Sequence, residues 1–283
     1  MADAVIWTFT ASDGYRWHYR HFPPSHKPSV RVVCLHGIQS HGGWYDASCR
    51  HLCDAGFDVY FLDRRGSGLN TQARGDAPSF RRLIDDVAEF IQVQRGPGSP
   101  PLVVSAISWG GKLAAGLCYR FPGLLDGLAM LTPGFCPRVR PPTAERLAIA
   151  RASVTAPTKL FPIPLNDPAL FTATPRWRQF IADDPLSLHK ATARFLLQSL
   201  KLDVYLKRAP KRITVPTLLL LAGEDRIIDN AKTRCFVERF AAKRKDVIEY
   251  SGAHHTLEFE PDPRQVFDDL TKWVREHVAT RSK

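Results

Sequence analysis

The sequence predicts an α/β fold in which a mostly parallel central sheet is flanked by helices and carries an inserted helical cap. Three observations lead to this prediction. Apolar, β-branched segments alternate with segments of helical period along most of the chain. The apolar segments are hydrophobic throughout rather than at every second residue, which is typical of parallel strands covered on both faces. The alternation stops between residues 134 and 210, which are rich in proline and contain no convincing strand.

The first half of the chain supplies most of the expected sheet. Residues 5–10 and 16–22 alternate in polarity around Ser12-Asp13-Gly14, which predicts a β-hairpin. Later strands are expected at residues 30–35, 57–62, 102–107 and 124–131, and helices at 44–55, 80–94 and 109–120. Gly56 is the expected stop of the first of these helices.

The second half begins with the interruption. Residues 134–210 are expected to be helical in pieces, at 143–153, 176–181 and 188–206. The pattern then resumes with strands at 215–221 and 247–250 and helices at 230–241 and 263–280. We therefore expect residues 1–133 and 211–283 to form the core and residues 134–210 to form a cap or lid over it.

The composition limits the class of protein. No run of about 18 apolar residues predicts a membrane span, and residues 1–7 lack the pattern of a secretory signal. Six scattered cysteines form no CxxC and no zinc spacing, and the pair Cys49 and Cys53 is not expected to form a disulfide or bind metal. We therefore expect a reducing, cytoplasmic compartment and neither a metal nor a cofactor.

The positive charge raises the question of a partner. The net charge is +11, and residues 134–210 hold 12 Lys and Arg against 5 Asp and Glu, so +7 of it lies on the expected cap. The basic residues form no stripe with interleaved aromatic residues, which excludes a typical nucleic-acid interface. An anionic membrane surface or an anionic amphiphile is the favoured partner, and a merely soluble basic surface is the alternative. The sequence does not predict an oligomeric state.

Ser108 is the candidate nucleophile. It follows the apolar run of residues 102–107 and precedes a helical pattern that begins at Trp109. The pentapeptide Ala106-Ile107-Ser108-Trp109-Gly110 is a variant of the G-x-S-x-G elbow, which exposes a serine hydroxyl at the carboxyl edge of a sheet. Ala106 stands where the elbow usually has glycine, so this motif depends on support from the rest of the chain.

A nucleophilic serine needs a base and a group that orients the base. Asp225 follows the strand expected at 215–221, and His255 follows the strand expected at 247–250. Asp229 and His254 are the alternatives, although Asp229 is also a suitable N-cap for the next helix. The order Ser, Asp, His along the chain is the one expected for an α/β-hydrolase.

With these residues in place, the chain resembles the monoacylglycerol lipase and lysophospholipase branch of the α/β-hydrolases, which overlaps the serine aminopeptidase-like group. The resemblance covers nearly the whole chain. It rests on residues 35–38 (LHGI), 40–45 (SHGGWY), 63–68 (DRRGSG), 108–111 (SWGG), 223–229 (GEDRIID) and 252–255 (GAHH). It implies that Asp225 is the acid, that His255 is the base, and that His36 orients its loop rather than acting as a base.

The oxyanion site and the pocket are expected around these loops. Two backbone N–H groups are needed, and we expect them from Trp109 and Ile38, with Gln39 as the fallback. Gly37, which precedes Ile38, permits the backbone turn required at this point. The expected substrate pocket contains Gln39, Trp109, Phe161 and Phe171, and bulky Trp109 is expected to form one wall.

These features predict a serine hydrolase that cleaves carboxylic esters of lipid-like substrates, such as a monoacylglycerol or a lysophospholipid, through an acyl-enzyme. An aminopeptidase or amidase, and an acyltransferase, are alternatives on the same three residues. A non-catalytic binding protein on this scaffold is a further alternative, disfavoured because all three residues are present.

Overall fold

Eight strands form one main sheet in the order β1-β2-β4-β3-β5-β6-β9-β10. The computed structural model describes residues 4–279 of the chain. The strands are β1 (Val5–Thr10), β2 (Arg16–Phe22), β3 (Arg31–Leu35), β4 (Asp58–Leu62), β5 (Leu102–Ile107), β6 (Gly127–Leu131), β9 (Thr217–Ala222) and β10 (Lys245–Tyr250). β2 pairs antiparallel with β1 and β4, and the remaining neighbours pair in parallel. The predicted hairpin and the mostly parallel sheet are confirmed.

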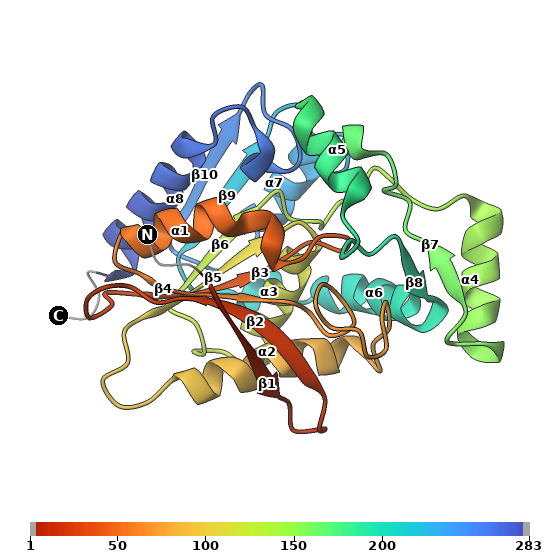
Figure 1. The fold of residues 1–283 in the computed structure, drawn as a ribbon, viewed down its shortest axis with the longest axis horizontal. Helices are drawn as coiled ribbons and strands as arrows, with labels where there is room; N and C mark the ends of the chain where they lie inside the picture. Colours follow the sequence, from red (N-terminus) through yellow and green to blue (C-terminus); the bar gives the residue numbers. More distant parts are fainter. Residues whose placement is uncertain (1–3, 280–283) are drawn as a thin grey trace.

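Helices cover both faces of this sheet (Figure 1). On one face α1 (Asp46–Asp54) packs against α8 (Arg264–His277), and on the other α2 (Phe80–Gln94) packs against α3 (Trp109–Arg120). α7 (Asn230–Glu238) follows β9, and the short 3₁₀ turns η1 (Gly42–Tyr45) and η4 (Leu257–Phe259) precede α1 and α8. Every residue of β4, β5 and β9 is buried, as expected for strands between two helical layers.

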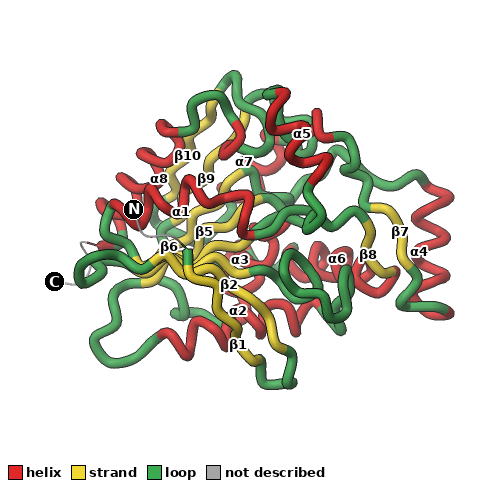
Figure 2. The backbone as a smooth tube through the Cα atoms, viewed as in Figure 1, coloured by secondary structure: helices red, strands yellow, loops and turns green. Residues whose placement is uncertain are grey.

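The insertion between β6 and β9 is mainly helical (Figure 2). It contains α4 (Thr143–Thr155), α5 (Pro175–Asp183), α6 (Ala193–Leu206) and the 3₁₀ turns η2 (Pro168–Leu170) and η3 (Pro210–Arg212). Two short strands, β7 (Leu160–Pro162) and β8 (Lys190–Thr192), pair antiparallel, so the prediction of an insertion without strands was wrong. Three-residue strands are too short to show a period in the sequence.

The start of α6 was also predicted too early, at Leu188. The side chain of Thr192 accepts a hydrogen bond from the N–H of Phe195 and caps the helix, which therefore begins at Ala193. The last helix ends at His277, and Thr280, where the prediction ended, lies outside the described residues.

The insertion packs onto the loops that follow the strands of the core. α6 contacts α2 and α3, and Lys112 of α3 forms an ion pair with Asp203 of α6 at 2.7 Å. The N–H of Leu188 donates to the carbonyl oxygen of Gln39, in the loop after β3, at 2.9 Å. Figure 1 shows α4 as the outermost helix, at the opposite end of the molecule from α8.

Candidate active site

Ser108 lies in a sharp turn between β5 and α3. Its backbone has φ 51° and ψ −121°, a strained conformation for a residue with a side chain. Its N–H donates to the carbonyl oxygen of Leu131 at 2.9 Å, and its own carbonyl oxygen accepts from Gly111 and Gly134. These hydrogen bonds, to the end of β6, to the residues after it and to α3, hold the turn in its strained conformation.

The elbow also depends on a close approach of α3 to β3. A Cβ atom at Gly110 would lie 2.7 Å from the carbonyl oxygens of Leu35 and His36, so only glycine fits there. Ala106, at the first position of the elbow, is fully buried, and its methyl group is accommodated within the core.

Two hydrogen bonds connect Ser108, His255 and Asp225. The Nε2 atom of His255 lies 2.9 Å from the Oγ of Ser108, and its Nδ1 lies 2.7 Å from the Oδ2 of Asp225. The other carboxylate oxygen of Asp225 accepts from the N–H groups of Ile227 and Ile228, at 2.8 and 3.0 Å. Because Asp225 only accepts hydrogen bonds, it directs the Nδ1 proton of His255 toward itself and leaves Nε2 as an acceptor for the serine proton.

The two competing residues have other partners. The side chain of Asp229 accepts from the N–H of Lys232 at 3.0 Å and caps α7. The N–H of His254 donates to Glu260 at 2.7 Å, and the His254 ring faces the same carboxylate. The structure brings His255 into hydrogen-bond contact with both Ser108 and Asp225, and these two bonds involve neither Asp229 nor His254.

Thr132 supports the histidine loop and was not singled out from the sequence. It follows β6, its φ of 43° is unusual for a β-branched residue, and its hydroxyl donates to the carbonyl oxygen of His255 at 2.9 Å. Its position at the carboxyl end of a buried strand, as for Ser108, was the available signal.

The loop after β3 lies against Ser108. A Cβ atom at Gly37 would be 3.3 Å from the Cβ of Ser108, so the backbone at Gly37 directly faces the serine. Within residues 4–279, neither the N–H of Ile38 nor that of Trp109 donates to another protein group. The two N–H groups predicted from the sequence are thus available to a ligand oxygen.

His36 and Arg64 support the loop after β3 through hydrogen bonds. The N–H of Arg64 donates to the Nε2 of His36 at 2.9 Å, so His36 carries its proton on Nδ1, which donates to the carbonyl oxygen of Gly37 at 2.7 Å. Burial, together with the charge of Arg64, holds the pKa of His36 well below its ordinary value. His36 is therefore neutral and hydrogen-bonded within this loop, and its role in orienting the loop stays a prediction.

The four expected pocket residues lie in different places. Phe171 contacts the ring of His255, with ring centroids 6.1 Å apart. The ring of Trp109 packs at a tilt against Phe195 of α6, and its Nε1 donates to the hydroxyl of Ser199 at 2.9 Å. Both rings are thus close to the proposed triad and to the insertion.

Gln39 lies at the junction of core and insertion, and Phe161 lies within the insertion. The amide nitrogen of Gln39 donates to the Nδ1 of His189 at 3.0 Å. Phe161 packs in a separate small cluster with Ile149, Ala152 and Ala193, so its contacts are with other residues of the insertion.

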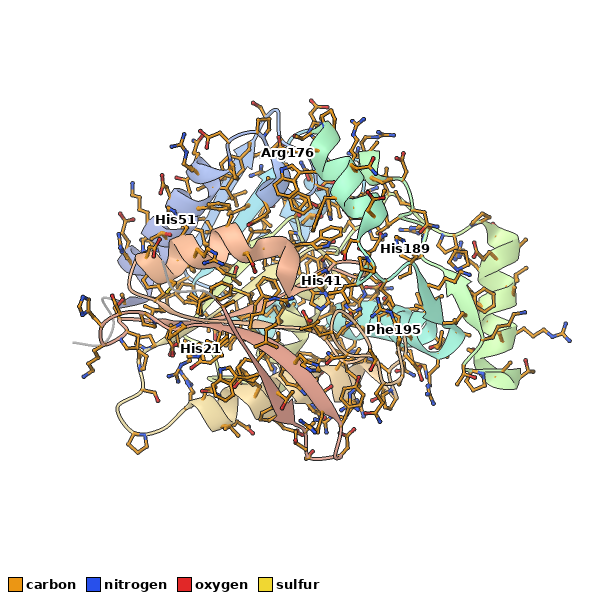
Figure 3. The ribbon with its side chains drawn as sticks, viewed as in Figure 1. His21, His41, His51, Arg176, His189 and Phe195 are labelled. Atoms are coloured by element: carbon orange, nitrogen blue, oxygen red, sulfur yellow. The ribbon has the colours of Figure 1, made fainter. Side chains whose placement is uncertain are left out.

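Asp184 joins the insertion to the loop after β3. Its Oδ2 accepts from the Nε2 of His41 at 3.0 Å, from the Nε1 of Trp44 at 2.7 Å and from the hydroxyl of Ser187 at 2.8 Å. His41 and His189, labelled in Figure 3, mark the core side and the insertion side of this junction. Among the described residues, no group of three or more His, Cys, Asp or Glu side chains could hold a metal ion.

Comparisons with known proteins identify the family of the chain. A family model described as serine aminopeptidase, S33, matches residues 26–262. The chain is 26% identical to a monoacylglycerol lipase of Mycolicibacterium smegmatis over 96% of this chain and 97% of the relative. It is 28% identical to lysophospholipase L2 of Escherichia coli over 90% of this chain and 82% of the relative.

Solved structures share the fold. A soluble variant of monoglyceride lipase from Saccharomyces cerevisiae, in complex with a substrate analogue, superimposes with a TM-score of 0.86 at 19% identity, covering 98% of this chain and 97% of that one. A monoacylglycerol lipase from Paleococcus ferrophilus superimposes with a TM-score of 0.81 at 21% identity, covering 98% and 100%. The central sheet with flanking helices is therefore an α/β-hydrolase fold.

Proposed function

The chain belongs to the serine aminopeptidase, S33, family of α/β-hydrolases, and we propose that it is a serine hydrolase that cleaves carboxylic esters of lipid-like substrates. The observation that carries the proposal is the chain of two hydrogen bonds from Ser108 through His255 to Asp225, with the serine on a strained elbow. Monoacylglycerols and lysophospholipids are the substrate class suggested by the relatives.

The reaction follows from the proton positions. As the Oγ of Ser108 attacks the ester carbonyl carbon, its proton passes to the Nε2 of His255, and Asp225 stabilises the resulting imidazolium. The carbonyl oxygen becomes an oxyanion, for which the N–H groups of Ile38 and Trp109 are the donors. The tetrahedral intermediate collapses, His255 returns the proton to the departing alcohol, and an acyl-enzyme remains on Ser108.

Deacylation repeats these steps with water. His255 takes a proton from the water that attacks the acyl carbon, and the serine leaves with that proton while the fatty acid is released. An alcohol in place of water would give acyl transfer from the same intermediate.

Two carboxylates of the insertion that pack on the core favour ester cleavage over the aminopeptidase reaction. A substrate with a free amine needs an unengaged carboxylate near the serine. Asp184 is engaged with His41, Trp44 and Ser187, and Asp203 with Lys112. The apolar ring of Phe171 beside His255 suits an acyl chain instead.

We further propose that residues 134–210 act as a cap that supplies part of the acyl pocket and contacts an anionic membrane surface peripherally. Exposed apolar side chains of α4 and α6 and the positive charge of this segment support the contact. None of the helices between residues 4 and 279 has both the length and the apolar character needed to span a bilayer. All six cysteines are free thiols, which fits the expected cytoplasmic compartment.

The proposal is tested by labelling with a fluorophosphonate and by turnover of p-nitrophenyl esters, a monoacylglycerol, a lysophospholipid and an aminoacyl amide. The wild-type chain should be labelled and should cleave the esters, and Ser108→Ala should lose both properties. Labelling that persists in Ser108→Ala would refute the nucleophile. Turnover of the amide without turnover of any ester would establish the aminopeptidase reaction in its place.

A further inference from the structure

Arg64 is a buried cation close to the proposed active site. It is 9% exposed and is the second residue after β4. Its guanidinium carbon lies 4.8 Å from the ring centroid of Trp109 and 5.2 Å from that of Phe195, which is labelled in Figure 3. Within residues 4–279 it forms no ion pair with a carboxylate, and its Nε has no hydrogen-bond partner.

The hydrogen bonds of the guanidinium go to the loop that faces Ser108. Nη1 donates to the carbonyl oxygen of Gly37 at 3.0 Å, and Nη2 donates to the carbonyl oxygen of Ile38 at 3.1 Å. The carbonyl of Gly37 and the N–H of Ile38 belong to the same peptide group. Arg64 therefore binds one end of the peptide whose other end is the proposed oxyanion donor.

This arrangement is costly to fold. Arg64 loses its hydration on burial, and its compensation is two backbone hydrogen bonds and two aromatic rings rather than a carboxylate. Burial lowers the pKa of Arg64 to about 9, only partly offset by the charge of Asp63. A neutral side chain of similar size, such as methionine, would fill the space between the two aromatic rings without this cost, so the charge itself calls for an explanation.

We propose that Arg64 is a positioning residue that fixes and polarises the Gly37–Ile38 peptide, and so strengthens the hydrogen bond from the Ile38 N–H to the oxyanion. This inference rests on the proposed function. A cation on the carbonyl oxygen draws electron density from the peptide nitrogen, which makes its N–H a better donor. The neutral His36 donates to the same carbonyl oxygen, so the two donors together fix the plane of the peptide.

The effect belongs to the transition state, because the full negative charge on the substrate oxygen develops only there. Removing an oxyanion donor costs roughly 10²–10³ in kcat, and weakening one should cost less. Arg64→Met should therefore lower kcat roughly 10–100-fold with little change in KM. Arg64→Lys, which keeps a charge and can donate to one of the two carbonyls, should recover part of this loss.

The matched control is Arg275→Met. Arg275 also donates to a backbone carbonyl, that of Ala55, and also lies over an aromatic ring, that of Phe57, but it belongs to α8 on the far side of the molecule. The Arg275→Met substitution should leave kcat unchanged.

A second readout is the inhibition constant of a trifluoromethyl ketone, whose adduct with a serine carries an oxyanion. Arg64→Met should raise this inhibition constant by the same factor by which it lowers kcat/KM.

Chemical rescue separates positioning from general loss of structure. Arg64→Ala leaves a space between Trp109 and Phe195, so methylguanidinium, at concentrations that leave the protein folded, should raise its kcat in a saturable way and leave that of Arg275→Ala unchanged.

Three results would overturn the inference. The first is an unchanged kcat in Arg64→Met, and the second is a change in KM for anionic substrates alone, which would make Arg64 a substrate-binding residue. The third is a loss of kcat that is relieved neither by Arg64→Lys nor, in Arg64→Ala, by methylguanidinium. Failure of the wild-type chain to cleave any ester would instead refute the proposed function.

Discussion

Asp225 illustrates how a single residue sets a proton position. Its Oδ1 accepts two backbone N–H bonds, from Ile227 and Ile228, so an asparagine at this position would keep its oxygen there and turn its NH₂ group toward His255. The Nδ1 of His255 would then accept, and its proton would sit on Nε2, facing Ser108. We expect Asp225→Asn to lower kcat by a factor on the order of 10⁴, as for the equivalent change in a serine protease. Steady-state ester hydrolysis measures this loss.

Asp229→Asn is the control for this prediction. Asp229 caps α7 through the N–H of Lys232, and asparagine is an equally good N-cap. Its kcat should match that of the wild type. A large loss in Asp229→Asn together with normal activity in Asp225→Asn would reverse the assignment of the acid.

The sequence predicted residues whose role depends on their position along the chain. Ser108, Asp225 and His255 each follow a strand, and parallel strands bring their carboxyl ends to one edge. Arg64 and Thr132 also follow strands, but their roles consist of hydrogen bonds to the carbonyl oxygens of Gly37, Ile38 and His255. Any residue type presents such an oxygen, so a motif such as residues 63–68 (DRRGSG) can include Arg64 without indicating these bonds.

At the scale of elements, Asp184 connects the insertion to the loop after β3. Burial alone would raise its pKa, but the hydrogen bonds from His41, Trp44 and Ser187 bring the pKa of Asp184 below its ordinary value. A carboxylate with a lowered pKa stabilises the folded state above the ordinary value near 4, and this contribution is lost as the pH falls below it. Asp184→Asn should therefore lower the free energy of unfolding by roughly 1–3 kcal/mol between pH 5 and 8.

Denaturant unfolding at a series of pH values checks this prediction. The difference between wild type and Asp184→Asn should be present from pH 5 to 8 and should shrink below pH 4. Asp183→Asn is the control, because the neighbouring Asp183 is exposed and accepts a hydrogen bond from Gln179 at the surface. A difference that does not vary with pH would mean that the charge of Asp184 is not involved.

Glu258 joins η4 to the first turn of α1. One carboxylate oxygen accepts from the N–H of Ser48 at 2.9 Å, yet burial raises the pKa of Glu258 to about 7. A carboxyl group with a raised pKa binds its proton more tightly in the folded state. The free energy of unfolding should therefore fall as the pH rises from about 4.5 to 7, by roughly 3 kcal/mol.

Glu258→Gln should remove this part of the pH dependence, because the amide oxygen can still accept from Ser48 and carries no charge. The variant should be more stable than the wild type at pH 8, and their difference should vanish near pH 4.5, in denaturant titrations. Glu238→Gln, on the exposed face of α7, should show neither effect. A wild type that is as stable at pH 8 as Glu258→Gln would contradict the raised pKa.

Long elements were predictable and short ones were not. The boundaries of α2 and α3 were predicted correctly, because a full helical period repeats over 15 and 12 residues. The ribbon of β7 and β8 was missed because each strand has 3 residues and depends on its partner for its hydrogen bonds. The contact between Asp184 and His41 spans 143 positions and is fixed only by tertiary packing.

At the scale of the whole molecule, charge and apolar exposure coincide on the insertion. Leu147 and Val154 of α4 are 68% and 83% exposed, and Arg146, Arg151 and Lys159 are exposed nearby. α4 is the outermost helix of the insertion (Figure 1). A basic, partly apolar face suits an anionic bilayer, where each Lys or Arg near the surface contributes about 1 kcal/mol.

We therefore expect the chain to bind vesicles that contain phosphatidylserine, and to bind them more weakly as salt is raised, because the Debye length is about 10 Å at 0.1 M and about 3 Å at 1 M. Replacing Arg146 and Arg151 together by glutamine should weaken binding by about 2 kcal/mol, roughly 30-fold, in a sedimentation assay. Leu147→Ser with Val154→Ser should weaken binding further at high salt, where burial of apolar area dominates.

The control is the pair Lys272→Gln and Arg275→Gln on α8, which removes the same charge from the opposite end of the molecule and should leave binding nearly unchanged. Equal losses in the two double variants would mean that net charge, and not this face, governs binding, and binding that salt does not weaken would exclude the electrostatic contact.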